Sequence, residues 1–325
     1  MLTKGLARAS MAHLPTPLEP LPRLTAQLKG PELWVKRDDQ TGLATGGNKA
    51  RKLAYLVAEA LAQQADLLIT CGAEQSNHAR QTAAAAAKFG LDCVLVLRGE
   101  QPAQVRGNLL LDHLLGARII WGGGQPLPRV MAETAERLRA AGRRPYVVPY
   151  GGSNPVGASG YAAAMEELLA QCTDLDVRFD RIVLASSSGG TQAGLMVGAR
   201  ALEYSGRILG ISVDRRADEL RAKLAELATA TAQHLALGET FSPEDFDVAD
   251  GYLGGGYAVV GDLEREAMRT VARAEGLLLD PVYTGRAFGG LLDLVRRGEF
   301  GSGERVLFWH TGGTAGLFGF GFEIR

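Results

Sequence analysis

A lysine beside two glycines is the first candidate for chemistry in this chain. Lys49 follows Gly46 and Gly47 in the segment GGNKARK, at the expected start of a helix. Cations are unfavourable at the positive end of a helix dipole, so this placement lowers the proton affinity of the amine. A neutral amine can form a Schiff base with a carbonyl cofactor. Lys52 lies one turn further on, where it could bind phosphate as a point charge; the alternative is two solvated surface lysines.

A phosphate site is predicted by the small residues SSSGGTQAG at 186–194. The segment directly follows the apolar strand pattern RIVLA and precedes a helical pattern. Free backbone N–H groups and the dipole at such a helix N-terminus favour an anion, and the hydroxyls of Ser188 and Thr191 can add to them. The alternative is a Gly-Ser turn whose hydroxyls only cap the helix.

Further polar side chains follow glycines or predicted strands. They supply hydroxyl, amide and phenol groups from Ser76, Asn77, Tyr257, Tyr283, Thr284 and Thr311. In QSNHAR at 75–80, the serine and asparagine predict either a helix cap or a substrate-facing hydroxyl and a donor to a cofactor oxygen. DPVYTGR is either a constrained ligand-facing turn or a simple connection, and HTGGTAG follows the last predicted strand. The tyrosine after three glycines at 254–256 either belongs to the core or projects into a cleft.

Short apolar runs that alternate with helical patterns place these loops on an α/β fold. Strands are expected at 33–36, 66–70, 92–97, 118–121, 145–148, 181–185, 207–213 and 305–309. Helices are expected at 49–63, 77–89, 127–141, 161–171, 191–204, 217–236, 263–275 and 285–297. The alternation predicts mainly parallel sheets, and the glycine-rich segment 151–160 is a plausible crossing between two layers. A ligand is then expected in the cleft between the layers, at the carboxyl ends of strands.

Composition narrows the class of protein. With 46% hydrophobic and 22% charged residues the chain is globular, and its formal net charge of −1 gives no general attraction to nucleic acid or to an anionic membrane. No secretory signal pattern and no apolar run of about 18 residues is present, so a cytoplasmic location is expected. Cys71, Cys93 and Cys172 are expected to be buried thiols, and the five scattered histidines show no metal spacing.

The glycine excess, 42 of 325 residues, invites a nucleotide-binding interpretation. However, no Gly-x-Gly-x-x-Gly opens a helix after a strand, and no Gly-x-x-x-x-Gly-Lys-Ser/Thr occurs. No serine has the flanking glycines of an α/β-hydrolase nucleophile elbow. A nucleotide-binding enzyme is therefore disfavoured.

Five motifs, in order from residue 36 to residue 319, resemble the D-cysteine desulfhydrase and 1-aminocyclopropane-1-carboxylate (ACC) deaminase family. They are KRDDQTGLATGGNKARKL, QSNHARQTAAAAAKFG, SSGGTQAGL, DPVYTGR and HTGGTAGLFG. The resemblance implies a pyridoxal phosphate (PLP) enzyme of the tryptophan synthase β-subunit fold, also called fold type II. Two open, mainly parallel sheet domains would enclose the active site. Residues 1–48 and 161–325 would form the larger, PLP-binding domain, and 49–160 the smaller nested domain.

The resemblance also implies roles for individual residues. Lys49 would hold PLP, and Asn77 would contact the oxygen at position 3 of its ring. The phosphate and the rest of the cofactor would lie against Lys52, Ser188, Gly189, Gly190, Thr191, Thr284 and Thr311. The substrate would face Ser76, Asn77, His78, Tyr257 and Tyr283, with the donors at 76–78 clamping its carboxylate. Lys49, Ser76 and the two tyrosines are the candidate catalytic groups, and which of them takes the α-proton stays open.

The ring nitrogen distinguishes members of the family. ACC deaminases typically carry DPVYEGK, whose glutamate pairs with the pyridine nitrogen, whereas this chain has Thr284 and Arg286. A neutral hydroxyl gives weaker carbanion stabilisation, and elimination of a good leaving group needs less of it. The resemblance therefore favours a carbon–sulfur lyase that converts D-cysteine to pyruvate, hydrogen sulfide and ammonia. The alternatives are an L-cysteate sulpho-lyase, an ACC deaminase and, more distantly, a non-catalytic amino-acid sensor. Relatives of this kind are usually homodimers, so a homodimer is expected.

Overall fold

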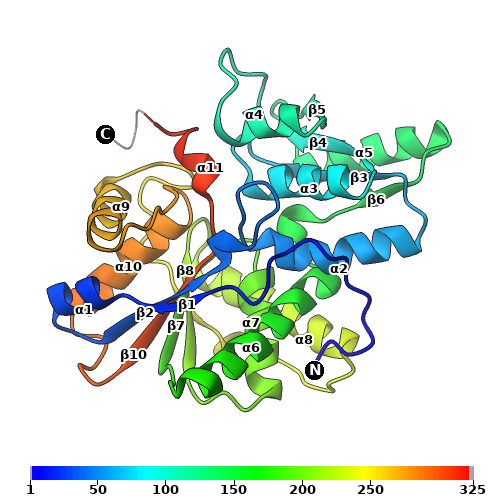
Figure 1. Cartoon of the computed structure of the whole chain (residues 1–325). Coiled ribbons are helices and arrows are strands. Elements are labelled where there is room, and N and C mark those ends of the chain that lie inside the picture. The colour runs from blue at the N-terminus through cyan, green and yellow to red at the C-terminus, as the bar shows by residue number, and fades with distance from the viewer. Residues whose placement is uncertain (1, 322–325) are drawn as a thin grey trace.

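The computed structural model describes residues 2–321 and contains two sheets, one above the other in Figure 1. The larger sheet has the order β1-β2-β10-β7-β8-β9, formed by Leu18–Pro20, Glu32–Arg37, Arg305–His310, Arg181–Ser186, Arg207–Ser212 and Asp247–Ala249. The smaller has the order β5-β4-β3-β6, formed by Arg118–Trp121, Asp92–Leu97, Leu67–Gly72 and Pro145–Val147. Within these two sheets β1 pairs antiparallel and every other strand pairs parallel. The prediction of two open, mainly parallel sheets is confirmed.

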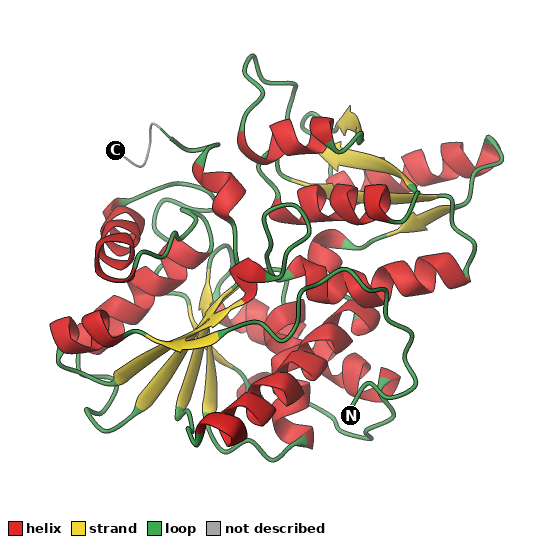
Figure 2. Cartoon of the chain, in the orientation of Figure 1, coloured by secondary structure: helices red, strands yellow, loops and turns green. Residues whose placement is uncertain are grey.

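Helices cover both sheets (Figure 2). They are α1 Pro22–Leu28, α2 Lys49–Ala62, α3 Asn77–Lys88, α4 Gly107–Leu114, α5 Leu127–Ala140, α6 Pro155–Leu175, α7 Gly190–Ala201, α8 Ala217–His234, α9 Asp262–Glu275, α10 Thr284–Arg296 and α11 Thr314–Leu317. Short 3₁₀ turns η1, η2 and η3 form at Asp38–Gln40, Tyr150–Gly152 and Pro243–Asp245. Among the described residues, no helix combines the length and apolarity needed to cross a membrane.

The larger sheet is buried on both faces. Leu184 and Trp309 belong to the apolar cluster that includes residues of α6, whereas Val183 and Phe308 belong to the cluster formed with α9 and α10. Neighbouring residues of a strand point to opposite faces, so a strand covered on both sides is apolar throughout. For this reason the central strands were predictable as apolar runs.

The predicted start of α6 at Tyr161 is wrong. The helix begins at Pro155, where the Asn154 side chain accepts a hydrogen bond from the N–H of Gly157 at 2.9 Å. The glycines of 151–160 suggested a loop, but a Cβ at Gly160 would overlap the backbone oxygen of Arg51 in α2. Glycine here allows two helices to approach closely, so the segment is helical from residue 155.

The elements that the sequence did not reveal are short. They are β1, α1, α4, β9 and α11, with three to eight residues each. Such lengths hold too few residues to show a helical or a strand period. The strands of the smaller sheet lie between residues 67 and 147, inside the sequence that forms the larger sheet. The exact domain limits, 1–48 with 161–325 and 49–160, stay a prediction. The three cysteines are buried free thiols, as predicted.

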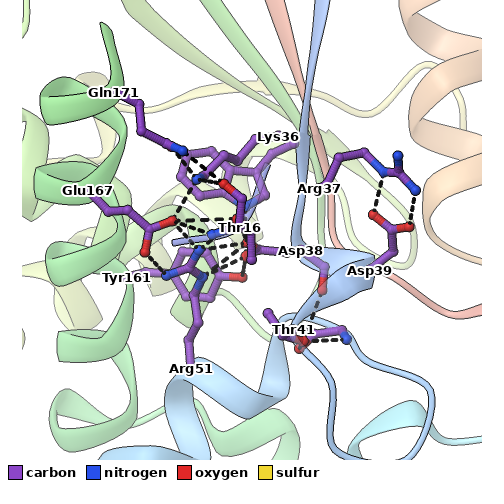
Figure 3. Close-up of polar contacts among 12 residues, drawn as sticks. Thr16, Lys36, Arg37, Asp38, Asp39, Thr41, Arg51, Tyr161, Glu167 and Gln171 are labelled. Atoms are coloured by element: carbon purple, nitrogen blue, oxygen red, sulfur yellow. Dashed lines mark hydrogen bonds and ion pairs between the residues drawn. The ribbon is translucent and has the colours of Figure 1, made fainter. Parts of the chain in front are cut away.

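A buried polar cluster joins β2, α2 and α6 (Figure 3). The Arg51 guanidinium contacts the carboxylates of Asp38 at 2.8 Å and Glu167 at 2.8 Å, and the Lys36 amine lies 2.6 Å from Glu167. Burial raises the pKa of Asp38, but Arg51 outweighs it and holds the pKa below its usual value. Because Arg51 is two residues beyond Lys49, the cluster fixes the first turn of α2 against the larger sheet.

Candidate active site

A cavity lies where strands of both sheets end. Its wall comes from the segments that follow β3, β6, β7 and β10, together with the start of α2. It is lined by Asn48, Lys49, Ser76, Asn77, His78, Tyr150, Gly151, Ala185, Ser186, Ser187, Ser188, Gly189, Thr191, Gln192, Tyr283, Thr311 and Gly312. The carboxyl ends of parallel strands are where α/β proteins bind ligands. This is the expected cleft between the two layers.

Lys49 is the first residue of α2, and the loop before it is held in an unusual conformation. Every residue from 42 to 47 has a positive φ, between 51° and 126°. Arg80 of α3 donates to the carbonyl oxygens of Ala44 and, at 3.1 Å, Gly46. The N–H of Asn48 donates to the carbonyl oxygen of Thr311 at 2.9 Å. Contacts from the layers of both sheets therefore hold the loop, and with it Lys49, in a defined position.

The Lys49 amine has a low proton affinity. Burial and then the positive charge of Arg80 lower its pKa from the usual 10.5 to about 8, against the opposing effect of Asp280. The direction matches the prediction, but burial and Arg80 are the causes rather than the helix dipole alone. A substantial fraction of this amine is neutral near pH 8, as a nucleophilic lysine requires.

The start of α7 forms a cup of small polar groups. The N–H of Gly190 donates to Ser153 Oγ at 3.1 Å, and that hydroxyl donates to Ser188 Oγ at 2.8 Å. The side-chain amide of Asn48 donates to Thr191 Oγ1 at 3.0 Å. The segment after β7 thus turns hydroxyls and a helix N-terminus toward one point, as predicted for an anion site.

Lys52 lies behind this cup and is 1% exposed. Its ammonium donates at 3.2 Å to two neutral groups, the carbonyl oxygen of Gly151 and the hydroxyl of Ser153. Among residues 2–321 no carboxylate pairs with it, and burial together with the Lys49 and Lys223 charges holds its pKa well below 10.5. A Cβ at Gly190 would lie 2.9 Å from the Lys52 nitrogen, so only glycine leaves this space open. A buried cation without a counter-ion, beside a helix N-terminus, is matched to an anion such as phosphate.

The start of α3 forms another part of the wall. Ser76 is the N-cap, and its Oγ accepts from the N–H of Ala79 at 3.1 Å, so the capping interpretation holds while the residue also lines the cavity. Asn77 Oδ1 accepts from Asn108 at 2.9 Å and from Arg80 at 3.4 Å. Its oxygen is thus occupied, and its NH₂ group remains to donate into the cavity.

His78 is a neutral residue of the same wall. Its Nε2 lies 2.9 Å from Thr70 Oγ1, and that hydroxyl donates to the carbonyl oxygen of Val148 at 2.8 Å. Because the hydroxyl hydrogen is committed, Nε2 carries the ring hydrogen, and the buried Nδ1 has no hydrogen-bond partner among residues 2–321. Burial and the charges of Lys49 and Lys52 hold the pKa of His78 well below 6.5.

Two tyrosines stand at the other side of the cavity. The hydroxyls of Tyr257 and Tyr283 are 2.6 Å apart, and Tyr283 lines the cavity while Tyr257 lies behind it. Burial raises the pKa of Tyr283 well above 10. Tyr150, which the sequence did not single out, also lines the cavity. Its signal was available, because the glycines of PYGG follow a predicted strand as the other site glycines do.

Thr284 is a predicted site residue that does not line the cavity. Its Oγ1 donates to Asp280 Oδ1 at 2.7 Å and accepts from the Asp280 N–H at 2.8 Å. Both functions of the hydroxyl are used at the start of α10, and Thr311 lines the cavity instead. The contact predicted between Thr284 and a cofactor ring stays a prediction.

Comparison with known proteins identifies the family. A family model described as "Pyridoxal-phosphate dependent enzyme" matches residues 9–312. The chain belongs to this PLP-dependent family. PLP is therefore its cofactor, and the buried Lys52 beside the cup of α7 fits the phosphate of that group.

The relatives of this PLP-dependent enzyme carry two names. A "D-cysteine desulfhydrase" from Salmonella typhi is 44% identical and covers 96% of both chains. A "Putative 1-aminocyclopropane-1-carboxylate deaminase" from Pyrococcus furiosus is 43% identical over 99% of this chain and 97% of its own. The crystal structure of an ACC deaminase homologue has a TM-score of 0.91 at 40% identity, covering 99% and 97% of the two chains. A threonine deaminase structure, 20% identical with a TM-score of 0.65 and 92% coverage of each chain, shares the fold. The predicted family and fold type II architecture are confirmed.

The structure brings most of the predicted site residues into the wall of one cavity. These are Lys49, Ser76, Asn77, His78, Ser188, Gly189, Thr191, Tyr283 and Thr311. Lys52, Gly190 and Tyr257 stand directly behind the wall through the contacts given above.

Proposed function

We propose that this PLP-dependent enzyme converts D-cysteine and water to pyruvate, hydrogen sulfide and ammonia by β-elimination. The observation that carries the proposal is the chemistry of the cavity wall: among the described residues that line it, none is an aspartate or glutamate. A cofactor ring bound there would meet hydroxyls and amides rather than a carboxylate at its nitrogen. That environment suits loss of a good leaving group, which needs less carbanion stabilisation than opening a cyclopropane ring.

The cofactor would be held by groups from both sheets. We assign Lys49 to the covalent attachment, and the cup of Ser188, Gly189, Gly190 and Thr191 with Lys52 behind it to the phosphate. Asn77 would donate to the ring oxygen, because its own oxygen is already occupied by Asn108 and Arg80. Thr311 lies on the cavity wall beside the loop that carries Lys49. Its carbonyl oxygen accepts a hydrogen bond from the N–H of Asn48, the residue before Lys49.

The amine and the tyrosines would have different roles in the reaction. PLP supplies, when bound, the electron sink that makes the α-hydrogen of an amino acid acidic. Lys49, with a pKa of about 8, can accept that proton in its neutral form. Tyr283 keeps its own proton because its pKa is raised well above 10. Lys49 is therefore the better candidate base, and the tyrosine pair is suited to hydrogen bonding with the departing sulfur.

The substrate carboxylate would bind at the start of α3. The first N–H groups of a helix have no partner within the helix and attract anions. Ser76 accepts from one of them, the N–H of Ala79, and its hydroxyl hydrogen is free to donate. His78 stays neutral because burial and the charges of Lys49 and Lys52 hold its pKa well below 6.5, so this wall would bind a carboxylate through dipoles rather than through a charged imidazole.

A panel of three substrates tests the proposal. The purified holoenzyme is offered D-cysteine, L-cysteate and ACC, and pyruvate or, from ACC, 2-oxobutyrate is measured together with ammonia. We expect the highest kcat/KM with D-cysteine and release of sulfide in equal amount. Lys49→Ala should abolish turnover, whereas Lys88→Ala, at an exposed position on α3, should not change it. Higher kcat/KM with L-cysteate or ACC would transfer the assignment to that substrate.

We extend the proposal to a homodimer, which the resemblance implies, and to a cytoplasmic location, which the sequence pattern predicts. Light scattering of the purified protein measures the mass of the particle in solution. A mass of one chain rather than two would contradict the dimer.

A further inference from the structure

The loop that carries Tyr257 is anchored on one face of α10. That helix begins immediately after Tyr283, and its residues 286, 290 and 293 are spaced as i, i+4 and i+7, which places them on a common face. The Tyr252 hydroxyl donates to Asp293 Oδ2 at 2.7 Å, and the Tyr252 ring lies over Gly290, where a Cβ would come within 3.0 Å of it. One helix therefore carries Tyr283 and also holds the segment from which Tyr257 projects.

Arg286 makes the central contacts of this face. Its side chain is 1% exposed, and its guanidinium donates to three backbone oxygens, those of Gly256 at 3.0 Å, Val259 at 2.9 Å and Val213 at 3.0 Å. Nε donates to Glu264 Oε1 at 2.6 Å. Two of the three oxygens flank Tyr257 in the chain, so the guanidinium fixes the backbone on both sides of the tyrosine.

Glu264 completes the arrangement from α9. Its second oxygen accepts from the N–H of Gly261 at 2.8 Å, where the loop ends. Within the loop, two backbone hydrogen bonds, from Gly256 to Leu253 and from Val259 to Gly256, close turns, but Gly254 and Gly256 adopt positive φ and glycine is conformationally permissive. The buried ion pair thus supplies order that the loop sequence lacks.

We propose that Arg286 is a positioning residue that, through the backbone of residues 256–259, holds the Tyr257 hydroxyl against that of Tyr283. The inference rests on the proposed function only in assigning the tyrosine pair to the substrate side of the site. A guanidinium is planar and can reach several acceptors in fixed directions, whereas an ammonium is a compact point charge. Lysine, which ACC deaminases typically carry at this position of the motif, cannot make the same set of contacts. Arg286 would therefore set the geometry of the tyrosine pair in this chain.

Hydrogen exchange tests the inference without turnover. In Arg286→Lys we expect the amides of residues 251–260 to exchange at least about tenfold faster, while the amides of α7 are unchanged. The control is Arg200→Lys: Arg200 also donates to a carbonyl oxygen, that of Thr240, and to a carboxylate, that of Asp245. It lies ten residues beyond the start of α7, about 15 Å from the cup. Equal exchange of 251–260 in the two variants would overturn the proposal.

A double-mutant cycle tests the route through Tyr257. We expect Arg286→Lys to lower kcat by about 10–100-fold, as misplacement of a group at the reacting centre does. In a Tyr257→Phe background the same change should lower kcat less than about threefold, because the hydroxyl that it positions is gone. Full additivity of the two losses would refute the route. Glu264→Gln, which keeps the shape of the pair, replaces Arg286→Lys if that variant does not fold, with the same expectations.

The two tests separate this inference from the proposed function. If D-cysteine is not turned over but ACC or L-cysteate is, the cycle is measured with that substrate and its interpretation is unchanged. If exchange of residues 251–260 responds to Arg286→Lys and the cycle is additive, the loop is anchored as described but Tyr257 is not the group that it serves, and the proposal fails.

Discussion

Replacing Lys52 by methionine should stabilise the apoenzyme and weaken its hold on the cofactor. The Lys52 amine is 1% exposed and, among the described residues, donates only to a carbonyl and a hydroxyl oxygen. In the folded apoenzyme it either stays charged without a counter-ion or gives up its proton, and both cost free energy. Methionine has a similar length and no charge. Removing an incompletely compensated polar group of this kind is worth about 1–3 kcal/mol. At about 1.5 °C per kcal/mol for a chain of this length, the apoenzyme should gain about 2–5 °C in Tm.

The same change removes the cation that the phosphate would meet. A hydrogen bond to a charged group contributes about 1.5–3 kcal/mol, so the Kd for PLP should rise about 10–150-fold. The increase in Tm that PLP causes should shrink accordingly. Lys52→Met should thus raise the Tm of the apoenzyme and lower its affinity for PLP. General damage to the fold would instead lower both the Tm and the affinity.

Calorimetry of the apoenzyme and a titration with PLP measure the two effects. Pyridoxal, which has the aldehyde but no phosphate, is the matched ligand, and its affinity should change less than about threefold in Lys52→Met. Lys88→Met, at an exposed position, should alter none of these values. A lower apoenzyme Tm, or equal weakening of PLP and pyridoxal, would refute the assignment of the cup to phosphate.

Three other predictions follow from single positions. The pKa of Lys49 is about 8 in the folded chain and 10.5 normally. The charged amine therefore lowers the free energy of unfolding by its full amount below pH 8, and this loss disappears as the pH rises toward 10.5. In urea unfolding at several pH values, the stability of the apoenzyme relative to Lys49→Met should rise between pH 8 and pH 10.5. Gly160→Ala should cost about 1–3 kcal/mol in the same assay, because its Cβ would overlap the Arg51 carbonyl, whereas Gly303→Ala, with nothing within 4 Å, should not. Ser76→Ala and Ser76→Gly should reduce turnover equally, but only the alanine should lower stability by about 1 kcal/mol, since glycine is nearly as good an N-cap as serine. A Gly variant as unstable as the Ala variant would show that the hydroxyl does more than cap α3.

The sequence predicted the central strands well because they are buried on both faces. β4 has the predicted bounds, and β7 differs from its prediction by one residue. An apolar run reports burial directly, and burial of both faces comes from covering helices. In contrast, the helix predicted from Tyr161 is shorter than α6. The glycines that allow close packing against α2 resemble those of a loop in composition. The sequence alone does not reveal that the space left by the absent side chain is filled by the backbone of α2.

The same limit applies to the site. Lys49, Ser76 and the cup at the start of α7 stand in motifs, where local spacing already places a side chain at the end of an element. The sequence showed Arg286 only as a variation within a motif, because the groups that accept its hydrogen bonds lie in two loops and in α9. Tyr150 was missed because it enters the cavity from the segment after a strand of the smaller sheet. Such contacts depend on distances between segments that the spacing of residues does not encode.

The position of Lys49 shows why this active site needs both sheets. Its loop is held by Arg80 from the smaller sheet's layer and by the backbone of Thr311 from the larger sheet, while Arg51 binds α2 to β2 through Asp38. Burial and then the same Arg80 that fixes the loop lower the pKa of the amine, so the position and the protonation of Lys49 are coupled. A change that loosens the two layers would therefore displace the lysine and raise its pKa together. The activity of such variants should be partly recovered at higher pH, where the lysine loses its proton again. A loss that does not depend on pH would show that displacement of Lys49, and not a change in its pKa, causes the loss.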